Sequence, residues 1–114
     1  MKLITQAHLS TSERSALSEF TLAVKQHLSS VDVILFGSKA RGDDTEFSDI
    51  DILVITDNAV TGSVREQLAA MQFEIEMKYD VIIGLNIKNR GFWNSSQGSA
   101  MPLHANVQRD GILL

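Results

Sequence analysis

The spacing of hydrophobic residues changes along the chain, and each change marks a different element. Between residues 11 and 29, apolar side chains recur every three or four positions, as they do on one face of an α-helix. They are Leu17, Phe20, Val24 and Leu28. Ser10 and Glu13 precede them at the spacing of a capping box, in which each side chain bonds the other residue's backbone amide. The pattern predicts a helix over about residues 11–29 that covers a sheet.

The next stretch predicts a buried strand followed by a tight turn. Residues 31–36 are apolar at every position but one and rich in β-branched residues, and the run is too short for a helix. Gly37 ends this strand, residues 38–41 suit a single helical turn, and Gly42 stops that turn. We expect residues 43–47 to form a polar loop.

A second strand is predicted over residues 49–56. Side chains in a strand alternate between its two faces, so Asp49 and Asp51 project together while Ile50 and Ile52 point the other way. The two carboxylates therefore share one face at the beginning of an otherwise apolar strand.

Residues 63–87 predict one long helix and a third strand. The helix spans about residues 63–78, with a second capping-box pattern at its start and an apolar stripe along one face. The capping residues are Ser63 and Glu66, and the stripe is Leu68, Met71 and Ile75. Residues 80–87 follow as a third strand with Asp80 at its first position.

The end of the chain predicts a loop and a short helix. Residues 88–101 are rich in Asn, Ser, Gly and Gln, so we expect a loop there with Phe92 and Trp93 as hydrophobic anchors. The only proline, Pro102, suits the first turn of a last helix. In that helix Leu103 and Val107 face inward, and Gly111 ends it.

The composition is that of one globular domain over residues 1–114, with 44% hydrophobic and 21% charged residues. The formal net charge of -4 argues against direct binding of nucleic acid. The chain has no cysteine, which excludes disulfides, thiolate metal sites and thiol catalysis. Because no apolar window is long enough to cross a membrane, we expect no membrane partner and a cytoplasmic location.

Asp49 and Asp51 are the first candidates for chemistry. Two carboxylates on one face of a strand lie about 6 to 7 Å apart, and at an effective dielectric constant of 20 they repel by about 2 to 3 kcal/mol. A divalent cation turns this repulsion into coordination, and carboxylate oxygens suit Mg²⁺ or Mn²⁺. A lone Asp-x-Asp is more often a solvated pair of acids where a strand begins, so a second signal is needed.

The turn at Gly37 and Ser38 is the second candidate. A glycine lets a phosphate approach the backbone, the serine offers a hydroxyl, and Lys39 and Arg41 supply cations. The spacing from Gly37 to Gly42 is that of a P-loop, but two aspartates follow where a P-loop requires Lys and Ser or Thr. In phosphatases of the haloacid dehalogenase type an apolar strand precedes the Asp-x-Asp pair, whereas here the apolar strand follows it.

The turn and the carboxylates together form a more specific motif. In FGSKARGDDTEFSDIDILV, ten residues separate Gly-Ser from Asp-x-Asp. This closely resembles the signature of the nucleotidyltransferase superfamily related to DNA polymerase β, in particular its minimal nucleotidyltransferases. The accessory residues Arg41, Gly42 and Ser48 match as well. The resemblance implies an α/β fold of the polymerase β type, in which a small mixed β-sheet carries helices packed against one face.

The resemblance also implies a reaction, in which a nucleoside monophosphate moves from a nucleoside triphosphate to a hydroxyl and pyrophosphate leaves. Asp49 and Asp51 would hold two Mg²⁺ ions, or Mn²⁺ in their place. In this family a third strand carries a further carboxylate, and Asp80 falls in that place. Asp80 would complete the second metal site and help deprotonate the acceptor.

The phosphate end of the site follows from the same resemblance. Gly37 and Ser38 would hold the terminal phosphates of the triphosphate, which we expect to be ATP. Lys39 or Arg41 would support them with positive charge.

A chain of this size has little room for an acceptor pocket, so the acceptor must come largely from elsewhere. Minimal nucleotidyltransferases are commonly paired with a HEPN protein, and the resemblance implies an antitoxin that adenylylates a tyrosine of a HEPN toxin. One alternative is a small-molecule nucleotidyltransferase for an aminoglycoside-like hydroxyl, with the pocket built by a homodimer or a second chain. The other is a binding module that neutralises its partner by contact alone.

Overall fold

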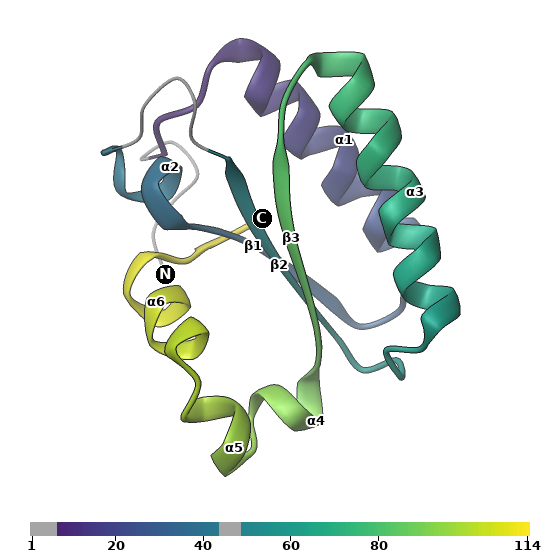
Figure 1. The fold of residues 1–114 in the computed structure, drawn as a ribbon, viewed down its shortest axis with the longest axis vertical. Helices are drawn as coiled ribbons and strands as arrows, with labels where there is room; N and C mark the ends of the chain where they lie inside the picture. The colour runs from purple at the N-terminus through teal and green to yellow at the C-terminus, as the bar shows by residue number, and fades with distance from the viewer. Residues whose placement is uncertain (1–6, 44–48) are drawn as a thin grey trace.

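A four-stranded mixed sheet in the order β3-β2-β1-β4 organises the chain (Figure 1). The computed structural model describes residues 7–43 and 49–114, so Ser48 of the sequence motif lies outside the described residues. The strands are β1 (Val31–Phe36), β2 (Ile50–Thr56), β3 (Ile83–Asn89) and β4 (Ile112–Leu113). β1 runs antiparallel to β2 and β4, while β3 runs parallel to β2. A parallel pair requires a crossover, which α3 (Gly62–Tyr79) provides.

The first helix, α1 (Thr11–His27), forms as its sequence predicts. The capping box is present: the Ser10 hydroxyl accepts a bond from the Glu13 amide at 3.1 Å, and the Glu13 carboxylate accepts one from the Ser10 amide at 2.9 Å. The predicted apolar stripe is buried, and it consists of Leu17, Phe20, Val24 and Leu28. This stripe packs the helix against the sheet, as expected.

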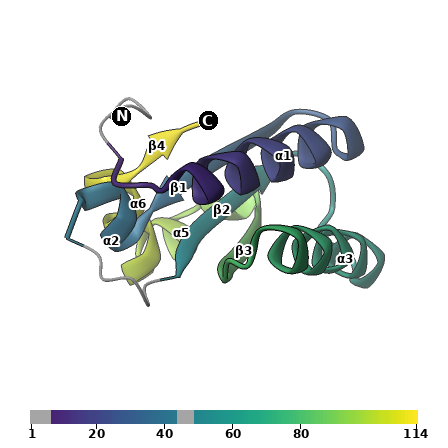
Figure 2. The same cartoon turned by 90° about the horizontal axis from the view of Figure 1, so that it is seen from above.

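The N-cap of the crossover helix α3 lies two residues before the predicted one. Its N-cap is Thr61, whose hydroxyl accepts a bond from the Val64 amide at 3.2 Å, and the Ser63 and Glu66 box is not what starts it. Leu68 and Ile75 are buried as predicted. α1 and α3 lie beside each other on one face of the sheet (Figures 1 and 2).

The third strand begins at Ile83, and the prediction that it begins at Asp80 was wrong. α3 continues to Tyr79, and Asp80 ends it in the left-handed conformation with φ of 54°. The Ile83 amide then donates to the Glu76 carboxylate at 2.9 Å, and the Ile83 carbonyl accepts from the Gln72 side chain at 2.7 Å. These two side chains of α3 fix where the chain becomes extended.

The opposite face of the sheet is covered by the end of the chain. Two short helices, α4 (Arg90–Trp93) and α5 (Ser96–Ser99), occupy the stretch that was predicted as a loop. Trp93 is buried as a predicted anchor and stacks on His104 at a ring distance of 4.5 Å, whereas Phe92, the other predicted anchor, is 39% exposed.

The last helix, α6 (Pro102–Asp110), runs from the predicted proline to Gly111. Val107 is buried against the sheet with Ile34 and Leu53, and Leu103 packs on the same cluster. Helices therefore cover both faces of the sheet, and the expectation that they pack against one face holds only for the long pair, because the short C-terminal helices lie on the other face (Figure 2). No helix among the described residues is long and apolar enough to cross a membrane.

Candidate active site

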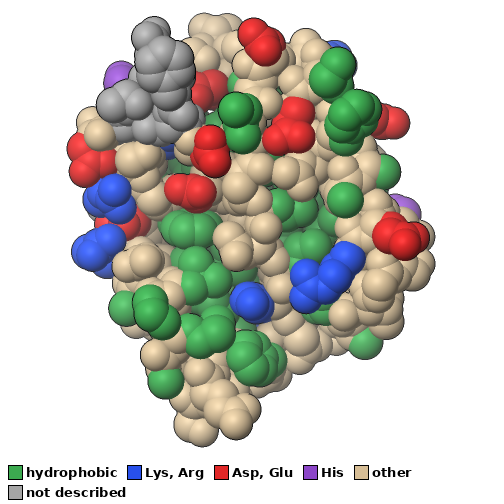
Figure 3. Space-filling view, in the orientation of Figure 1, with side chains coloured by type: hydrophobic (Ala, Val, Ile, Leu, Met, Phe, Trp, Pro, Cys, Tyr) green, Lys and Arg blue, Asp and Glu red, His purple; other side chains and the backbone are tan. Residues whose placement is uncertain are grey.

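Asp51 lies where three elements meet. It pairs in register with Phe36, the last residue of β1, and with Gly84, the second residue of β3. The chain leaves β1 through α2 (Gly37–Arg41), the predicted single turn, which Gly42 ends in the left-handed conformation. In the space-filling view, acidic side chains gather at this end of the sheet, above a strip of hydrophobic ones (Figure 3).

Two glycines make room for the Asp51 carboxylate. Gly37 has φ of 78°, and a Cβ atom at this position would overlap Oδ2 of Asp51. A Cβ atom on Gly84 would lie 2.8 Å from Oδ1. Each carboxylate oxygen thus faces a residue without a side chain. From the sequence, Gly37 was expected to contact a phosphate, and Gly84 was not expected to belong to the site. The only signal for Gly84 was its position inside an apolar run.

The electrostatics of Asp51 favour a bound cation. Burial raises the pKa of its carboxyl, the neighbouring charge of Asp49 raises that pKa further, and the positive charge of Arg41 acts in the opposite direction. Asp49 directly precedes β2 and is exposed. A divalent cation between the two carboxylates would offset both the burial and the repulsion, so the donor set suits Mg²⁺ or Mn²⁺.

Asp80 is not brought into β3 beside this pair. It is an exposed residue at the end of α3, three positions before the strand begins. Within residues 7–43 and 49–114, no three His, Cys, Asp or Glu side chains are grouped closely enough to hold a metal ion. The described residues therefore present two carboxylates for a metal, and the part assigned to Asp80 stays a prediction.

The two predicted cations have different surroundings. Lys39 is only 3% exposed, and its ammonium group lies 2.6 Å from the Glu13 carboxylate. Burial alone would raise the pKa of Glu13, but the hydrogen bonds from Lys39 and Ser10 outweigh it and lower that pKa. The ion pair ties α2 to the start of α1. Lys39 thus holds the turn in place, and Arg41 is the more accessible of the two cations.

Arg41 belongs to a network that the sequence did not reveal. Its Nη1 atom donates to the carboxylate of Asp110 at 2.8 Å, and its Nε atom donates to Asp43 at 3.1 Å. Asp110 stands 69 residues away at the end of α6 and is 2% exposed. Ser38, the other residue of the turn, is half-buried, and its carbonyl accepts bonds from the Gly42 and Asp43 amides.

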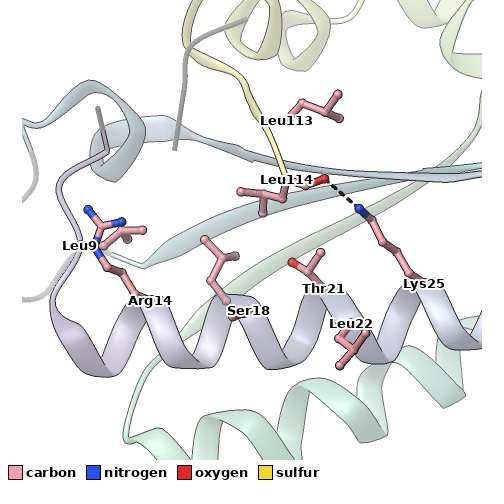
Figure 4. Close-up of a pocket in the computed structure, with 9 residues that line it drawn as sticks. Leu9, Arg14, Ser18, Thr21, Leu22, Lys25, Leu113 and Leu114 are labelled. Carbon is pink, nitrogen blue, oxygen red and sulfur yellow. Dashed lines mark hydrogen bonds between the residues drawn. The ribbon is translucent and has the colours of Figure 1, made fainter. Parts of the chain in front are cut away.

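A cavity of about 510 Å³ lies elsewhere, between α1 and the end of the chain (Figure 4). Its lining consists of Leu9, Arg14, Leu17, Ser18, Thr21, Leu22, Lys25, Leu113 and Leu114. Lys25 crosses it to donate to the Leu114 carbonyl at 2.9 Å. The cavity contains none of the predicted site residues and lies on the α1 side of the sheet, away from the Asp51 carboxylate.

Comparison with known proteins decides the family. The family model described as "Nucleotidyltransferase domain" matches residues 17–97, which include the Gly37 turn, Asp49, Asp51 and β3. The chain belongs to this nucleotidyltransferase family. The resemblance seen in the sequence is confirmed, and so is its implication that the protein is an enzyme of this class.

Two relatives of this nucleotidyltransferase come from Methanocaldococcus jannaschii. The first, named "Putative protein adenylyltransferase MJ0604", is 33% identical over 104 residues, which cover 90% of this chain and 97% of that protein. The second, named "Putative protein adenylyltransferase MJ0141", is 39% identical over 51 residues, which cover 45% of this chain and 52% of that protein. The first match spans nearly the whole of both chains.

Two solved structures share the fold of the nucleotidyltransferase. A toxin-antitoxin structure with AMP-PNP matches with a TM-score of 0.61 and 19% identity, over 85% of this chain and 70% of that chain. A mutant of the toxin-antitoxin MntA-HpeT matches with a TM-score of 0.59 and 16% identity over the same shares. At these identities the likeness concerns the fold, and it confirms the predicted α/β architecture.

Proposed function

We propose that this nucleotidyltransferase moves AMP from ATP onto a hydroxyl of a protein partner, and that it is the antitoxin of a pair whose toxin is a HEPN protein. The observation that carries the catalytic part is the position of the Asp51 carboxylate at the end of the sheet. It lies between Gly37, the first residue of α2, and Gly84 of β3. The choice of a protein acceptor is supported by the full-length relative that is named a protein adenylyltransferase. The toxin-antitoxin titles of the fold neighbours support the choice of partner.

In this proposal Asp49 and Asp51 would hold Mg²⁺, and the bound ion would supply positive charge near the triphosphate and the departing pyrophosphate. Gly37 and Ser38 lie against the terminal phosphates, and Arg41 adds positive charge beside them. Lys39 acts indirectly, because its ion pair with Glu13 fixes the turn that carries Gly37, Ser38 and Arg41.

The reaction is a displacement at the α-phosphorus of ATP. The acceptor hydroxyl oxygen forms the new bond to that phosphorus, and the bond to the oxygen bridging the α- and β-phosphates breaks. Pyrophosphate leaves with the electron pair, and the hydroxyl proton passes to a carboxylate of the site or to water. Asp80 is the carboxylate that the resemblance assigns to this step. It would act from the end of α3, beside the start of β3.

The test is transfer of label from ATP labelled at the α-phosphate. Purified protein is incubated with Mg²⁺, labelled ATP and a purified HEPN protein as the proposed partner, and the products are separated by gel electrophoresis. We expect label on the partner chain and, by mass spectrometry, an added AMP on a tyrosine. Aminoglycosides offered in place of the partner should take up no label.

The alternatives give different results in the same assay. Label on an aminoglycoside but not on the protein would replace the proposed acceptor with a small molecule. If Asp49→Asn still neutralised the partner while transferring no label, contact alone would account for neutralisation. Absence of label on every acceptor, with wild-type protein and Mg²⁺, would contradict the proposed reaction.

A further inference from the structure

Asp110 is a buried carboxylate shared by two arginines. It is 2% exposed, and its Oδ2 atom accepts bonds from Arg41 at 2.8 Å and from Arg109 at 2.9 Å. Its Oδ1 atom accepts a third bond, from Nε of Arg109 at 3.0 Å. Arg41 lies on α2 and Asp110 lies on α6, so the carboxylate joins the turn beside Asp51 to the last helix of the domain.

The charges around Asp110 leave Arg41 able to bind an anion. Asp110 stays ionised: the bond from Arg109 lowers its pKa, burial raises it, and the bond from Arg41 lowers it again. Asp110 and its two arginines together carry a net positive charge, which the exposed Asp43 beside Arg41 balances. Arg109 therefore offsets the charge of Asp110, which would otherwise cancel that of Arg41. Asp43, a further described acid that Arg41 contacts, is 62% exposed and Arg109 is 63% exposed, so water screens both of these charges, and a phosphate has to compete with Asp43 for Arg41.

The position of Asp110 is itself fixed. Val107, three residues earlier, is buried in the cluster on this face of the sheet. Gly111, one residue later, packs so closely that a Cβ atom there would lie 3.2 Å from Ile34 and would overlap the Val107 carbonyl. Asp110 is thus a rigid acceptor, whereas Arg41 is a long side chain that is 36% exposed. To the acids among residues 7–43 and 49–114, Arg41 donates through its Nε and Nη1 atoms and not through Nη2.

We propose that Asp110 is a positioning residue: it holds the Arg41 guanidinium at the phosphate end of the site, with Arg109 offsetting its charge. The inference rests on the proposed function, in which Arg41 supports the phosphates of ATP. An arginine already held in one orientation loses less conformational entropy when it binds a phosphate, so the nucleotide binds more tightly. Asp110 lies beyond the residues matched by the family model, and the role is assigned from this structure alone.

The test is isothermal titration calorimetry of Mg²⁺-ATP and of AMP. Asp110→Asn removes the Asp110 charge and frees the Arg41 side chain. The conformational entropy then lost when Arg41 is ordered by the nucleotide should weaken binding of Mg²⁺-ATP by about tenfold. AMP lacks the outer phosphates, so its affinity should change by less than about threefold. Arg41→Gln should show the same preference, and the double variant should lose no more than Arg41→Gln alone. Asp110→Glu should recover part of the lost affinity.

Asp32→Asn is the matched control, because Asp32 also accepts an arginine bond at 2.8 Å, from Arg90, at the other end of β1. It should bind Mg²⁺-ATP like wild type. If Asp110→Asn does not fold, Asp110→Asn combined with Arg109→Gln removes one charge of each sign, and it should show the same selective loss.

The results separate the two proposals. Wild-type affinity for Mg²⁺-ATP in a folded Asp110 variant, or a loss that adds fully to that of Arg41→Gln, would overturn the role of Asp110 alone. An equal loss for AMP and Mg²⁺-ATP would mean that Asp110 only stabilises the fold, and would also overturn it. Failure of wild-type protein to bind Mg²⁺-ATP would overturn the proposed function, and the role of Asp110 with it.

Discussion

At the scale of single residues, the space beside Asp51 makes Gly84 the position most sensitive to a small change. A methyl group in Gly84→Ala would lie 2.8 Å from Oδ1 of Asp51 and would push the carboxylate out of place. Because a small misplacement of this proposed metal ligand would be costly, we expect nucleotidyl transfer to fall by more than about tenfold. The melting temperature should change little, since the end of a flexible side chain can move away.

Gly62→Ala provides the matched control for this variant. A Cβ atom on Gly62 would meet nothing within 4 Å, and the residue lies at the start of a helix. Alanine there should stabilise the fold by up to about 1 kcal/mol and leave transfer unchanged. Wild-type transfer rates in Gly84→Ala would contradict the conclusion that Gly84 makes room for the Asp51 carboxylate.

The raised pKa of Asp51 predicts how stability depends on pH in the metal-free protein. Since its pKa is higher in the folded than in the unfolded chain, the protonated form favours folding. This contribution is fully present below the unfolded pKa of about 3.9 and is lost as pH rises through the folded pKa. At pH 7 the charged group therefore destabilises the fold, and Asp51→Asn should melt at a higher temperature than wild type.

Thermal unfolding in the presence of EDTA measures this effect. The advantage of Asp51→Asn should shrink as pH falls and should vanish near pH 3. Added Mg²⁺ should raise the melting temperature of wild type and not that of the variant. A variant that is less stable than wild type at pH 7 would contradict the electrostatic account.

The backbone conformation of Asp80 allows a substitution that removes its charge without disturbing the turn. Its φ of 54° lies in the left-handed region, which asparagine adopts about as readily as aspartate, so Asp80→Asn removes the charge and keeps the turn. If Asp80 supplies the third carboxylate, transfer should fall by more than about tenfold with no change in the melting temperature. Unchanged transfer would remove Asp80 from the site.

At the scale of elements, the two long helices show how far a local pattern can be followed. The capping-box pattern was right for Ser10 and wrong for Ser63, although both pairs have the same spacing. α3 begins earlier than predicted, at Gly62, with Thr61 as its N-cap. Thr61→Ala should therefore cost about 1 kcal/mol of unfolding free energy in urea, and Ser63→Ala should cost much less. A larger loss of stability in Ser63→Ala than in Thr61→Ala would instead support the predicted helix start at Ser63.

The elements that sequence reasoning missed or misplaced depend on contacts from elsewhere in the chain. β4 has two residues and exists because it pairs with β1. The start of β3 is set by Glu76 and Gln72 on α3, which bond to the backbone of Ile83. By contrast α1, β1 and α2 follow from patterns contained within their own residues, and each lies close to where it was predicted.

At the scale of the molecule, the family and the fold were predictable because the Gly-Ser and Asp-x-Asp motif spans two paired strands. Asp49, Asp51 and the Gly37 turn meet because β1 and β2 are neighbours in sequence and in the sheet. Gly84 and Asp110 could not be placed, since their roles depend on the parallel register of β3 and on the return of α6 to the turn. Local patterns carry no information about either.

We propose that the Asp51 carboxylate, between Gly37 and Gly84, lies at the catalytic centre of a metal-dependent nucleotidyltransferase. The most direct measurement is transfer from α-labelled ATP to the protein partner by wild type and Asp51→Asn, each with Mg²⁺ and with EDTA, after both proteins have been shown to be folded. We predict label on the partner only with wild type and Mg²⁺, and a decrease of more than about 100-fold in Asp51→Asn. Equal transfer by a folded Asp51→Asn would contradict the claim.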